Sequence, residues 1–506
     1  MPYFTRCLIA AMVCAFVAAP APAQSLPNLP LTRLAYTVKK RTVNPQGELK
    51  EKIDAVDKDL AEATRQGKNG EVRRLLAKGQ ALLNGTAWTD ALDYGNALVL
   101  RSDHVFVDTT RPYTARLEQI YSPAIDLQHN VTAHASLRKP AAPGARAEVV
   151  KDLGTFDDVS RDLRESPFLM ELDLSGVPDG PYQLQVEVSD GPARPLGVAS
   201  LRFVAQKGLD ATLARLESGA ATVPEKFRAD IVYPLDYIRN VNLGRIEMRP
   251  FNQFDFAKEV AAAEQTLAAA KTGKDPFTAR TGDFKRHYLL KAAKEIMPYH
   301  MYVPAACSTK VCPLVVALHG LGGTEDSMLS SFYRIPPLAE QHGFIVVAPM
   351  GYRVDGFYGY SALSANNRNT ELSAEDVMDV LQLVRHDYKI DDNRIYLMGH
   401  SMGGIGTWAL GAKHPELWAA LGPISGLGNP ATVDTMRHIP EIVVHGDADN
   451  VVPVGSSRIM VAAMKKLNVD VKYIEVPGGS HTDVAGPNMA AIFDFFEAHR
   501  KESATR

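Results

Sequence analysis

The chain has 506 residues, of which 46% are hydrophobic and 22% are charged. These fractions are typical of a folded globular protein and exclude a disordered or fibrous chain, and the length predicts roughly three domains. With 55 basic and 58 acidic residues the formal net charge is −3, so the chain lacks the basic excess that nucleic acids or anionic membranes attract. We therefore expect neither nucleic acid nor a membrane as a partner.

Residues 1–23 have the pattern of a cleaved secretory signal peptide. Arg6 supplies a positive charge, residues 8–19 are uniformly apolar, and Ala21-Pro22-Ala23 offers the small residues that a signal peptidase reads. The apolar run is too short to cross a hydrocarbon layer of about 30 Å. The alternative is a buried N-terminal helix. Because no later run is long enough to span a membrane, we expect a secreted or periplasmic protein.

Cysteine usage agrees with export. Removal of the signal peptide would leave two cysteines, Cys307 and Cys312. In an oxidising compartment we expect this pair to form one short-loop disulfide. Two cysteines are too few for a structural metal site, so the sequence predicts a structural cross-link.

The first half of the chain contains three regions with different sequence patterns. Residues 24–100 are predicted to be helical, including a hairpin over residues 48–83. Residues 101–206 show short alternating runs, the clearest at residues 182–188, between turns rich in glycine, proline and aspartate. This pattern predicts an immunoglobulin-like β-sandwich. Residues 207–282 return to helical spacing and are predicted to form a helical linker region.

Residues 283–506 read as an α/β domain with a doubly wound, mostly parallel sheet. Apolar runs without alternation indicate strands that are buried on both faces. These runs are residues 313–318, 344–348, 394–398, 418–424, 441–444 and 471–476. Amphipathic runs between them predict helices at residues 328–342, 374–388, 402–413, 456–467 and 488–498. Ser373 and Asp376 are expected to form a capping box for the second of these helices.

A serine follows the third predicted strand in a tight turn before a helix. The turn reads Gly399-His400-Ser401-Met402-Gly403. The G-x-S-x-G pattern alone is weak, but a turn this tight between strand and helix needs glycine neighbours and holds the serine hydroxyl above the sheet. The positive end of the following helix faces developing negative charge. We therefore expect Ser401 to be a nucleophile.

A glycine-rich loop follows the first predicted strand of this domain. It reads His319-Gly320-Leu321-Gly322-Gly323. Such a loop allows the Leu321 amide to approach a substrate oxygen, with the Met402 amide as its partner in an oxyanion hole. A dinucleotide phosphate loop is the alternative, but the spacing is not G-x-G-x-x-G. We expect the side chain of His319 to order the loop.

Two further motifs supply an acid and a base. Asp447 and Asp449 follow the next-to-last predicted strand, and His481 follows the last. Serine, acid and histidine in this chain order are expected of a hydrolase with such a sheet. A serine hydroxyl needs a base within hydrogen-bond reach, and a carboxylate must orient that base. Three residues near these motifs, His400, Trp408 and His445, are interpreted as packing or core residues.

Taken together, the His319-Gly320 loop, the Ser401 turn, the run from His445 to Pro453 and the terminal Gly479-Ser480-His481 resemble the α/β-hydrolase superfamily. Within it they are similar to secreted feruloyl esterases, polyhydroxybutyrate depolymerases and prolyl-oligopeptidase-like enzymes. The resemblance covers residues 285–500. It implies that Asp449 is the acid, with Asp447 as the alternative. No metal or organic cofactor is implied.

The substrate is predicted from the loop over residues 351–372, which is long enough to bind a ligand. Its aromatic side chains are Tyr352, Phe357, Tyr358 and Tyr360. They suit an aryl acyl group such as a feruloyl ester, or they pack the loop on the domain. We expect a serine esterase acting on small or polymer-linked esters. The alternatives are a prolyl-oligopeptidase-like peptidase and an inactive secreted binding protein. The sequence predicts no oligomeric state.

Overall fold

The structure is a computed structural model that describes residues 29–140, 147–191, 194–246, 254–364 and 366–501. The expected signal peptide, residues 1–23, lies outside the described residues. The chain divides into two compact units. One comprises Met1–Ala214 and Ile238–Met248, and the other comprises Arg215–Tyr237 and Arg249–Arg506.

The described residues of the first unit begin with four helices. These are α2 (Leu29–Val43), α3 (Gly47–Arg65), α4 (Asn69–Leu83) and α5 (Asp90–Ala97). The α3–α4 pair is the hairpin predicted from sequence, and the chain turns between them at Gly67, where φ is +66°. Apolar residues at helical spacing, including Ile53, Val56 and Leu76, form the core that these helices share.

Eight strands follow among the described residues of this unit. They are β1 (Leu98–Arg101), β2 (Phe106–Val107), β3 (Tyr113–Gln119), β4 (Val131–Arg138), β5 (Val149–Val159), β6 (Phe168–Leu172), β7 (Gly180–Ser189) and β8 (Pro195–Ala205). They form a three-stranded sheet in the order β1-β3-β6 and a five-stranded sheet in the order β2-β8-β7-β4-β5. Residues such as Leu117 from the first sheet and Leu184 from the second share one hydrophobic core, as the alternation along these strands requires.

Three helices connect the strands of the first unit to the C-terminal sheet. They are α6 (Leu209–Ala220), α7 (Arg228–Asn242) and α8 (Phe256–Lys271). The division between the two units passes through α6 and α7. Within the second unit, Leu216, Phe227, Ile231 and Leu267 belong to one apolar cluster, so these helices bury their apolar faces against one another.

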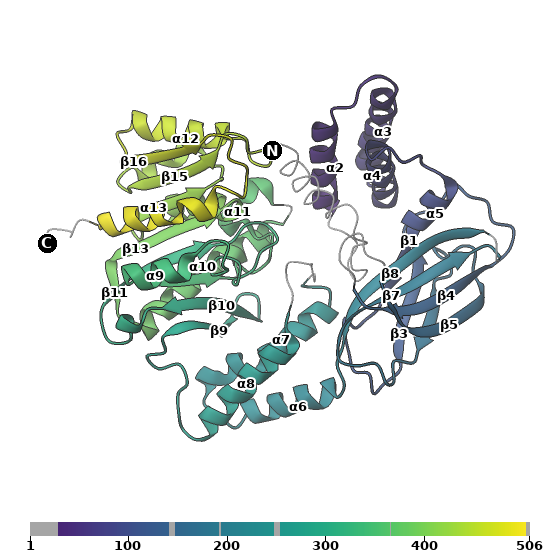
Figure 1. Ribbon diagram of the computed structural model, residues 1–506, viewed down its shortest axis with the longest axis horizontal. Helices are drawn as coiled ribbons and strands as arrows, with labels where there is room; N and C mark the ends of the chain where they lie inside the picture. The colour runs from purple at the N-terminus through teal and green to yellow at the C-terminus, as the bar shows by residue number, and fades with distance from the viewer. Residues whose placement is uncertain (1–28, 141–146, 192–193, 247–253, 365, 502–506) are drawn as a thin grey trace. The chain divides into compact units, whose positions relative to one another are not determined.

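The C-terminal part of the second unit is built on one eight-stranded sheet (Figure 1). Its order is β16-β15-β14-β13-β11-β12-β10-β9. The strands are β9 (Gly282–Leu290), β10 (Glu295–Val303), β11 (Cys312–Leu318), β12 (Ile345–Pro349), β13 (Ile390–His400), β14 (Ala420–Ile424), β15 (Glu441–Gly446) and β16 (Val471–Val476). Strands β11 to β16 pair in parallel, whereas β9 and β10 are antiparallel.

Helices cover both faces of this sheet. They are α9 (Ile335–His342), α10 (Asn367–Asp387), α11 (Met402–Lys413), α12 (Gly455–Lys466) and α13 (Ala485–Ala498). On one face Val316 packs in a core with residues of α10, α11 and α12. On the other face its neighbour Val315 packs with residues of α9 and α13. The doubly wound arrangement predicted from the unalternating strands is confirmed.

Short 3₁₀ segments complete the described elements. They are η1 (Glu225–Phe227), η2 (Ala305–Ser308), η3 (Phe357–Gly359), η4 (Ser361–Leu363) and η5 (Pro430–Met436). Cys307 and Cys312 form a disulfide, with their Cα atoms 5.8 Å apart, as predicted. Across the residues that the structure covers, none of the helices is both long enough and apolar enough to span a membrane.

The structure corrects two predicted helices. The helix expected over residues 328–342 begins only at Ile335, because turns occupy the preceding residues. The helix expected from residue 374 begins at Asn367, and its N-cap is Asn366, whose side chain accepts hydrogen bonds from the amides of Arg368 and Asn369. Ser373 and Asp376 therefore lie inside α10 and do not cap it. Strands β9 and β10 were not predicted from the sequence, because their partly exposed residues interrupt the apolar pattern.

Candidate active site

Ser401 occupies a strained turn at the carboxyl end of β13. Its φ is +57° and its ψ is −115°, a conformation that residues with a side chain rarely adopt. Backbone crowding explains the glycines beside it. A Cβ atom on Gly399 would lie 2.4 Å from the carbonyl oxygen of Gly403, and one on Gly403 would lie 2.0 Å from the carbonyl oxygen of Leu318. The turn therefore closes only with glycine at both positions, and it leaves Ser401 at the N-terminus of α11.

Three predicted side chains form one hydrogen-bonded series. The Ser401 hydroxyl donates to Nε2 of His481 at 2.8 Å. Nδ1 of His481 lies 2.7 Å from Oδ2 of Asp449 and donates to it. These residues follow β13, β15 and β16, so the series assembles at the carboxyl edge of the sheet, where ligands bind in this architecture.

The environment of Asp449 keeps its carboxylate ionised. Burial raises its pKa, but hydrogen bonds from His445 and His481 and from the amides of Val451 and Val452 oppose this, and the net pKa is well below the ordinary value. Asp447, the alternative acid, is exposed and accepts a hydrogen bond from the amide of Gly478. The structure brings Asp449, and not Asp447, to His481.

Sequence analysis missed the contacts of His400. Its Nε2 lies 2.8 Å from the carbonyl oxygen of His481, and its Nδ1 lies 2.9 Å from the hydroxyl of Tyr333. The rings of His400 and His481 are 5.1 Å apart between centroids. Burial lowers the pKa of His400 to about 4, with the nearby charge of His481 contributing. His400 is thus a buried neutral ring bonded to the backbone of His481.

His445 was also interpreted only as a core residue. Its side chain is fully buried, and its Nε2 lies 3.1 Å from Oδ2 of Asp449 and 2.9 Å from the carbonyl oxygen of Val452. Its Nδ1 lies 2.7 Å from the hydroxyl of Ser457 in α12. The four-residue spacing between His445 and Asp449 was the available sequence signal for this contact. No sequence pattern near Ser457 indicated its hydrogen bond with His445.

The glycine-rich loop after β11 lies against the Ser401 turn. A Cβ atom on Gly320 would contact the backbone oxygen of His400 at 3.4 Å and Cβ of Ser401 at 3.5 Å. Gly320 therefore lies beside Ser401, and Leu321 is the next residue in the chain. His319, whose pKa is lowered by burial, has one ring nitrogen 2.8 Å from the carbonyl oxygen of Gly320 and the other 2.7 Å from that of Met350. It links the loop to the end of β12, as expected.

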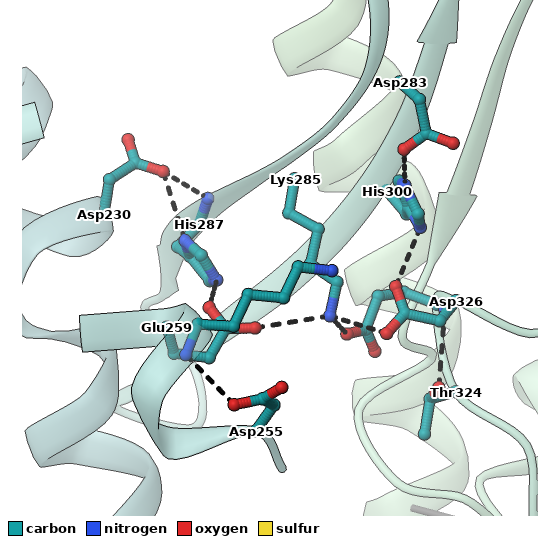
Figure 2. A network of polar contacts seen from close by, with 11 residues as sticks. Asp230, Asp255, Glu259, Asp283, Lys285, His287, His300, Thr324 and Asp326 are labelled. Carbon is teal, nitrogen blue, oxygen red and sulfur yellow. Dashed lines mark hydrogen bonds and ion pairs between the residues drawn. The ribbon is translucent and has the colours of Figure 1, made fainter. Parts of the chain in front are cut away.

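A buried ionic network fixes the far end of this loop (Figure 2). The Lys285 ammonium, on β9, lies 2.9 Å from Glu325, 2.7 Å from Asp326 and 3.5 Å from Glu259 on α8. Burial lowers the pKa of Lys285, but these three carboxylates raise it to a net value above the ordinary one. Figure 2 shows Lys285 between the helix and the loop. The network thus ties the loop that carries Leu321 to elements earlier in the chain.

His300 on β10 extends the same network. Its ring contacts Asp283 through Nε2 and Asp326 through Nδ1 (Figure 2). Burial lowers the pKa of His300, but the hydrogen bonds and charges of the two carboxylates raise it to about 9. The ring is therefore positively charged at neutral pH. It contacts Oδ1 of Asp326, whereas Lys285 contacts Oδ2.

Two side chains predicted to cap a helix instead anchor the loop after β12. Oγ of Ser373 accepts a hydrogen bond from the amide of Tyr358 at 3.1 Å. Oδ2 of Asp376 accepts one from the amide of Tyr352 at 2.7 Å, and Oδ1 accepts one from the hydroxyl of Tyr288 at 2.6 Å. Burial raises the pKa of Asp376 to about 7, although these hydrogen bonds lower it. The expected binding loop is consequently shorter than predicted and held at two points.

The aromatic side chains of this loop fall into two groups. Tyr358 is fully buried, donates to the carbonyl oxygen of His319 and packs on Gly406. Tyr352 is buried and bonded to Glu295. Both rings form part of the core. These two side chains therefore pack the loop on the domain, the alternative to binding an aryl group. Phe357 and Tyr360 are partly exposed, so they are the two members of the set with surface left for a ligand.

Comparisons with known proteins identify relatives of the part of the chain that carries this site. Residues 305–500 match the family described as Phospholipase/Carboxylesterase. Feruloyl esterase B of Neurospora crassa is 31% identical over 130 residues, which are 26% of this chain and 44% of that protein. S-formylglutathione hydrolase of Bos taurus is 28% identical over 151 residues, 26% of this chain and 53% of that protein.

A bifunctional acetylxylan esterase/xylanase of Neocallimastix patriciarum is 29% identical over 169 residues, 33% of this chain and 23% of that protein. This chain thus spans about half or less of the length of each of these three relatives. Among solved structures, a thermostable esterase has a TM-score of 0.40 at 17% identity, over 77% of this chain and 95% of that one.

The sheet and the family match define residues 305–500 as an α/β-hydrolase domain. This domain matches the Phospholipase/Carboxylesterase family, and its relatives are named as esterases and an S-formylglutathione hydrolase. The motifs indicated a similarity to feruloyl esterases, and a feruloyl esterase is among the relatives found.

The burial of Tyr358 predicts that its replacement acts on stability. Tyr358→Ala should lower the free energy of unfolding by about 3–5 kcal/mol, because it empties a fully buried aromatic site. Tyr360→Ala, on the same loop, should lower it by about 1 kcal/mol or less. Denaturant unfolding of both variants measures this difference. Equal losses, or a larger loss for Tyr360→Ala, would contradict the placement of Tyr358 in the core.

The charge of His300 predicts a pH-dependent stability. Its pKa of about 9 in the folded protein exceeds the ordinary value of 6.5, so its contribution is fully present below pH 6.5 and disappears as pH rises through about 9. His300→Gln should lose at most about 3 kcal/mol at pH 6 and almost nothing at pH 10. Denaturant unfolding across this range tests it, with exposed His129→Gln as the control. A pH-independent loss for His300→Gln would show that its charge is not involved.

Proposed function

We propose that this chain is an exported serine esterase that cleaves carboxylic esters through an acyl-enzyme. The observation that carries the proposal is the continuous series of hydrogen bonds from Ser401 through His481 to Asp449. Export follows from the predicted signal peptide over residues 1–23. We also propose that the strands between residues 98 and 205 form an immunoglobulin-like sandwich, since two sheets there share one core.

The proposed reaction uses each member of the series in turn. His481 removes the proton from Ser401 as its oxygen attacks the acyl carbon, and Asp449 stabilises the imidazolium that forms. The amides of Leu321 and Met402 stabilise the oxyanion, each worth about 2.7–4 kcal/mol in related sites. His481 then passes its proton to the leaving alcohol. Water activated by His481 hydrolyses the acyl-enzyme and restores Ser401.

The acyl group that we propose is aromatic. One relative is named feruloyl esterase B, and Phe357 and Tyr360 are partly exposed on the loop after β12. Another relative is named S-formylglutathione hydrolase, so this thioester is a useful comparison substrate. The names of these relatives favour esters over the prolyl peptides that the motifs alone also allowed.

A substrate panel tests the proposed activity. The mature chain should hydrolyse methyl ferulate and nitrophenyl esters faster than S-formylglutathione, a polyester or a prolyl peptide. Ser401→Ala should abolish each activity, and a fluorophosphonate probe should label the unchanged protein but not this variant. Cleavage of the peptide alone would refute the esterase proposal. A folded chain that reacts with neither ester nor probe would favour the inactive binding protein.

Two matched variants test the acid. Asp449→Asn should lower kcat by several orders of magnitude, on the order of 10⁴, because the amide cannot stabilise the imidazolium or set its tautomer. Asp447→Asn changes the same functional group two residues away on an exposed side chain. It keeps an oxygen that can accept from the Gly478 amide, so it should leave kcat within about threefold of the original. The opposite ranking would assign the acid to Asp447.

A further inference from the structure

We propose that His400 and His445 are positioning residues of the triad, each held as the neutral Nε2–H tautomer by a buried hydroxyl group. Tyr333 provides the hydroxyl for His400, and Ser457 provides it for His445. The inference rests on the proposed function, because it concerns the same triad. Sequence analysis treated both histidines as packing residues.

The tautomer of His445 follows from its partners. Nε2 faces two groups that only accept hydrogen bonds, the ionised carboxylate of Asp449 at 3.1 Å and the carbonyl of Val452 at 2.9 Å. Nε2 must therefore carry a proton. On the other side of the ring, Nδ1 lies 2.7 Å from the Ser457 hydroxyl. In a neutral ring Nδ1 accepts, so the hydroxyl donates and fixes the proton on the side of Asp449.

The same reasoning applies to His400. Its Nε2 faces the carbonyl oxygen of His481 at 2.8 Å and must donate. Its Nδ1 lies 2.9 Å from the Tyr333 hydroxyl and accepts from it. His400 and Tyr333 are both buried, so water does not compete for these groups. The hydroxyl thus directs the Nε2–H of His400 toward the backbone of His481.

The two rings act on opposite ends of the acid–base pair. His445 holds Oδ2 of Asp449, the oxygen that also accepts from His481. His400 holds the main chain of His481 itself. Because both rings are neutral in this arrangement, neither adds a positive charge beside the imidazolium of His481 during catalysis. Each contributes geometry and a fixed dipole.

Without either hydroxyl, the histidine should stay in place but its proton should no longer be fixed on Nε2. Tyr333→Phe and Ser457→Ala remove only an oxygen atom. Partners that orient a functional histidine in this way are worth about 10–100-fold at metal sites, so we expect each variant to react with a fluorophosphonate at Ser401 at least about tenfold more slowly. For an ester that the protein hydrolyses, kcat should fall while KM stays within about twofold.

Matched controls remove a hydroxyl elsewhere. Ser456→Ala changes the residue next to Ser457 on the same helix. Tyr302→Phe removes a hydroxyl on β10 that bonds to Glu340 on α9. Both should keep the probe reaction rate of the original protein. The probe rate does not depend on the natural substrate. A protein that reacts with the probe but hydrolyses no ester therefore refutes the proposed function without affecting this test.

A spectroscopic measurement reads the tautomers directly. In protein labelled with ¹⁵N at histidine, the ring nitrogens of His400 and His445 should show an unprotonated Nδ1 and a protonated Nε2 at neutral pH. Tyr333→Phe should change the signals of His400, and Ser457→Ala those of His445. Assignment uses His400→Gln and His445→Gln.

Three results would overturn the proposal. One is a doubly protonated ring at either histidine at neutral pH. Another is a protonated Nδ1 with an unprotonated Nε2. The third is an unchanged probe rate in both Tyr333→Phe and Ser457→Ala while the ring signals change. A slower probe reaction together with changed ring signals, in variants whose unfolding midpoint matches that of the controls, supports it.

Discussion

The contact between the loops after β15 and β16 determines whether the acid can reach the base. A Cβ atom on Gly446 would lie 2.1 Å from the carbonyl oxygen of Gly479, so only glycine allows the two backbones to come this close. The amide of Ala448 donates to the same oxygen, and the amide of Gly478 donates to Asp447. These bonds join the two loops at a distance where Asp449 and His481 meet. Asp447, the unused carboxylate, thus has a structural role beside the triad.

A second constraint comes from outside the segment that matches the family. The match begins at residue 305, whereas Lys285 and His300, which contact the acidic end of the loop that carries Leu321, both precede it. Glu259, which contacts Lys285, precedes it as well. His287 adds a contact to Asp230 on α7 (Figure 2), and Arg286 contacts the same carboxylate. Breaking one partner of such a buried network leaves an uncompensated charge. The helices before the sheet are therefore part of what keeps the loop that carries Leu321 in place.

The catalytic motifs were predictable because each is local. A turn that needs glycine on both sides of Ser401, and a histidine after the last strand, are visible in a few consecutive residues. Residues alone did not separate Asp449 from Asp447, because the choice depends on which carboxylate faces His481. Contacts between distant residues had no such signal. Tyr333 and His400 are 67 positions apart, and Lys285 and Glu325 are 40 positions apart.

The errors have the same physical origin. Ser373 and Asp376 match a capping box, but the same oxygens accept hydrogen bonds from loop amides in the tertiary structure. Strands β9 and β10 lie at the antiparallel edge of the sheet, where partly exposed residues break the apolar run that marked the central strands. Aromatic residues in a loop were expected to bind substrate, and Tyr358 instead packs on Gly406 and Gly351. Burial of a loop residue is decided by elements far away in sequence.

The most direct test of the account is a crystal structure of the protein after a fluorophosphonate has reacted with it. We expect the phosphorus on Oγ of Ser401, with one phosphonyl oxygen about 2.7–3.1 Å from the amides of Leu321 and Met402. His481 should remain bonded to Asp449. An adduct on another residue would contradict the account, as would a phosphonyl oxygen that points away from both amides.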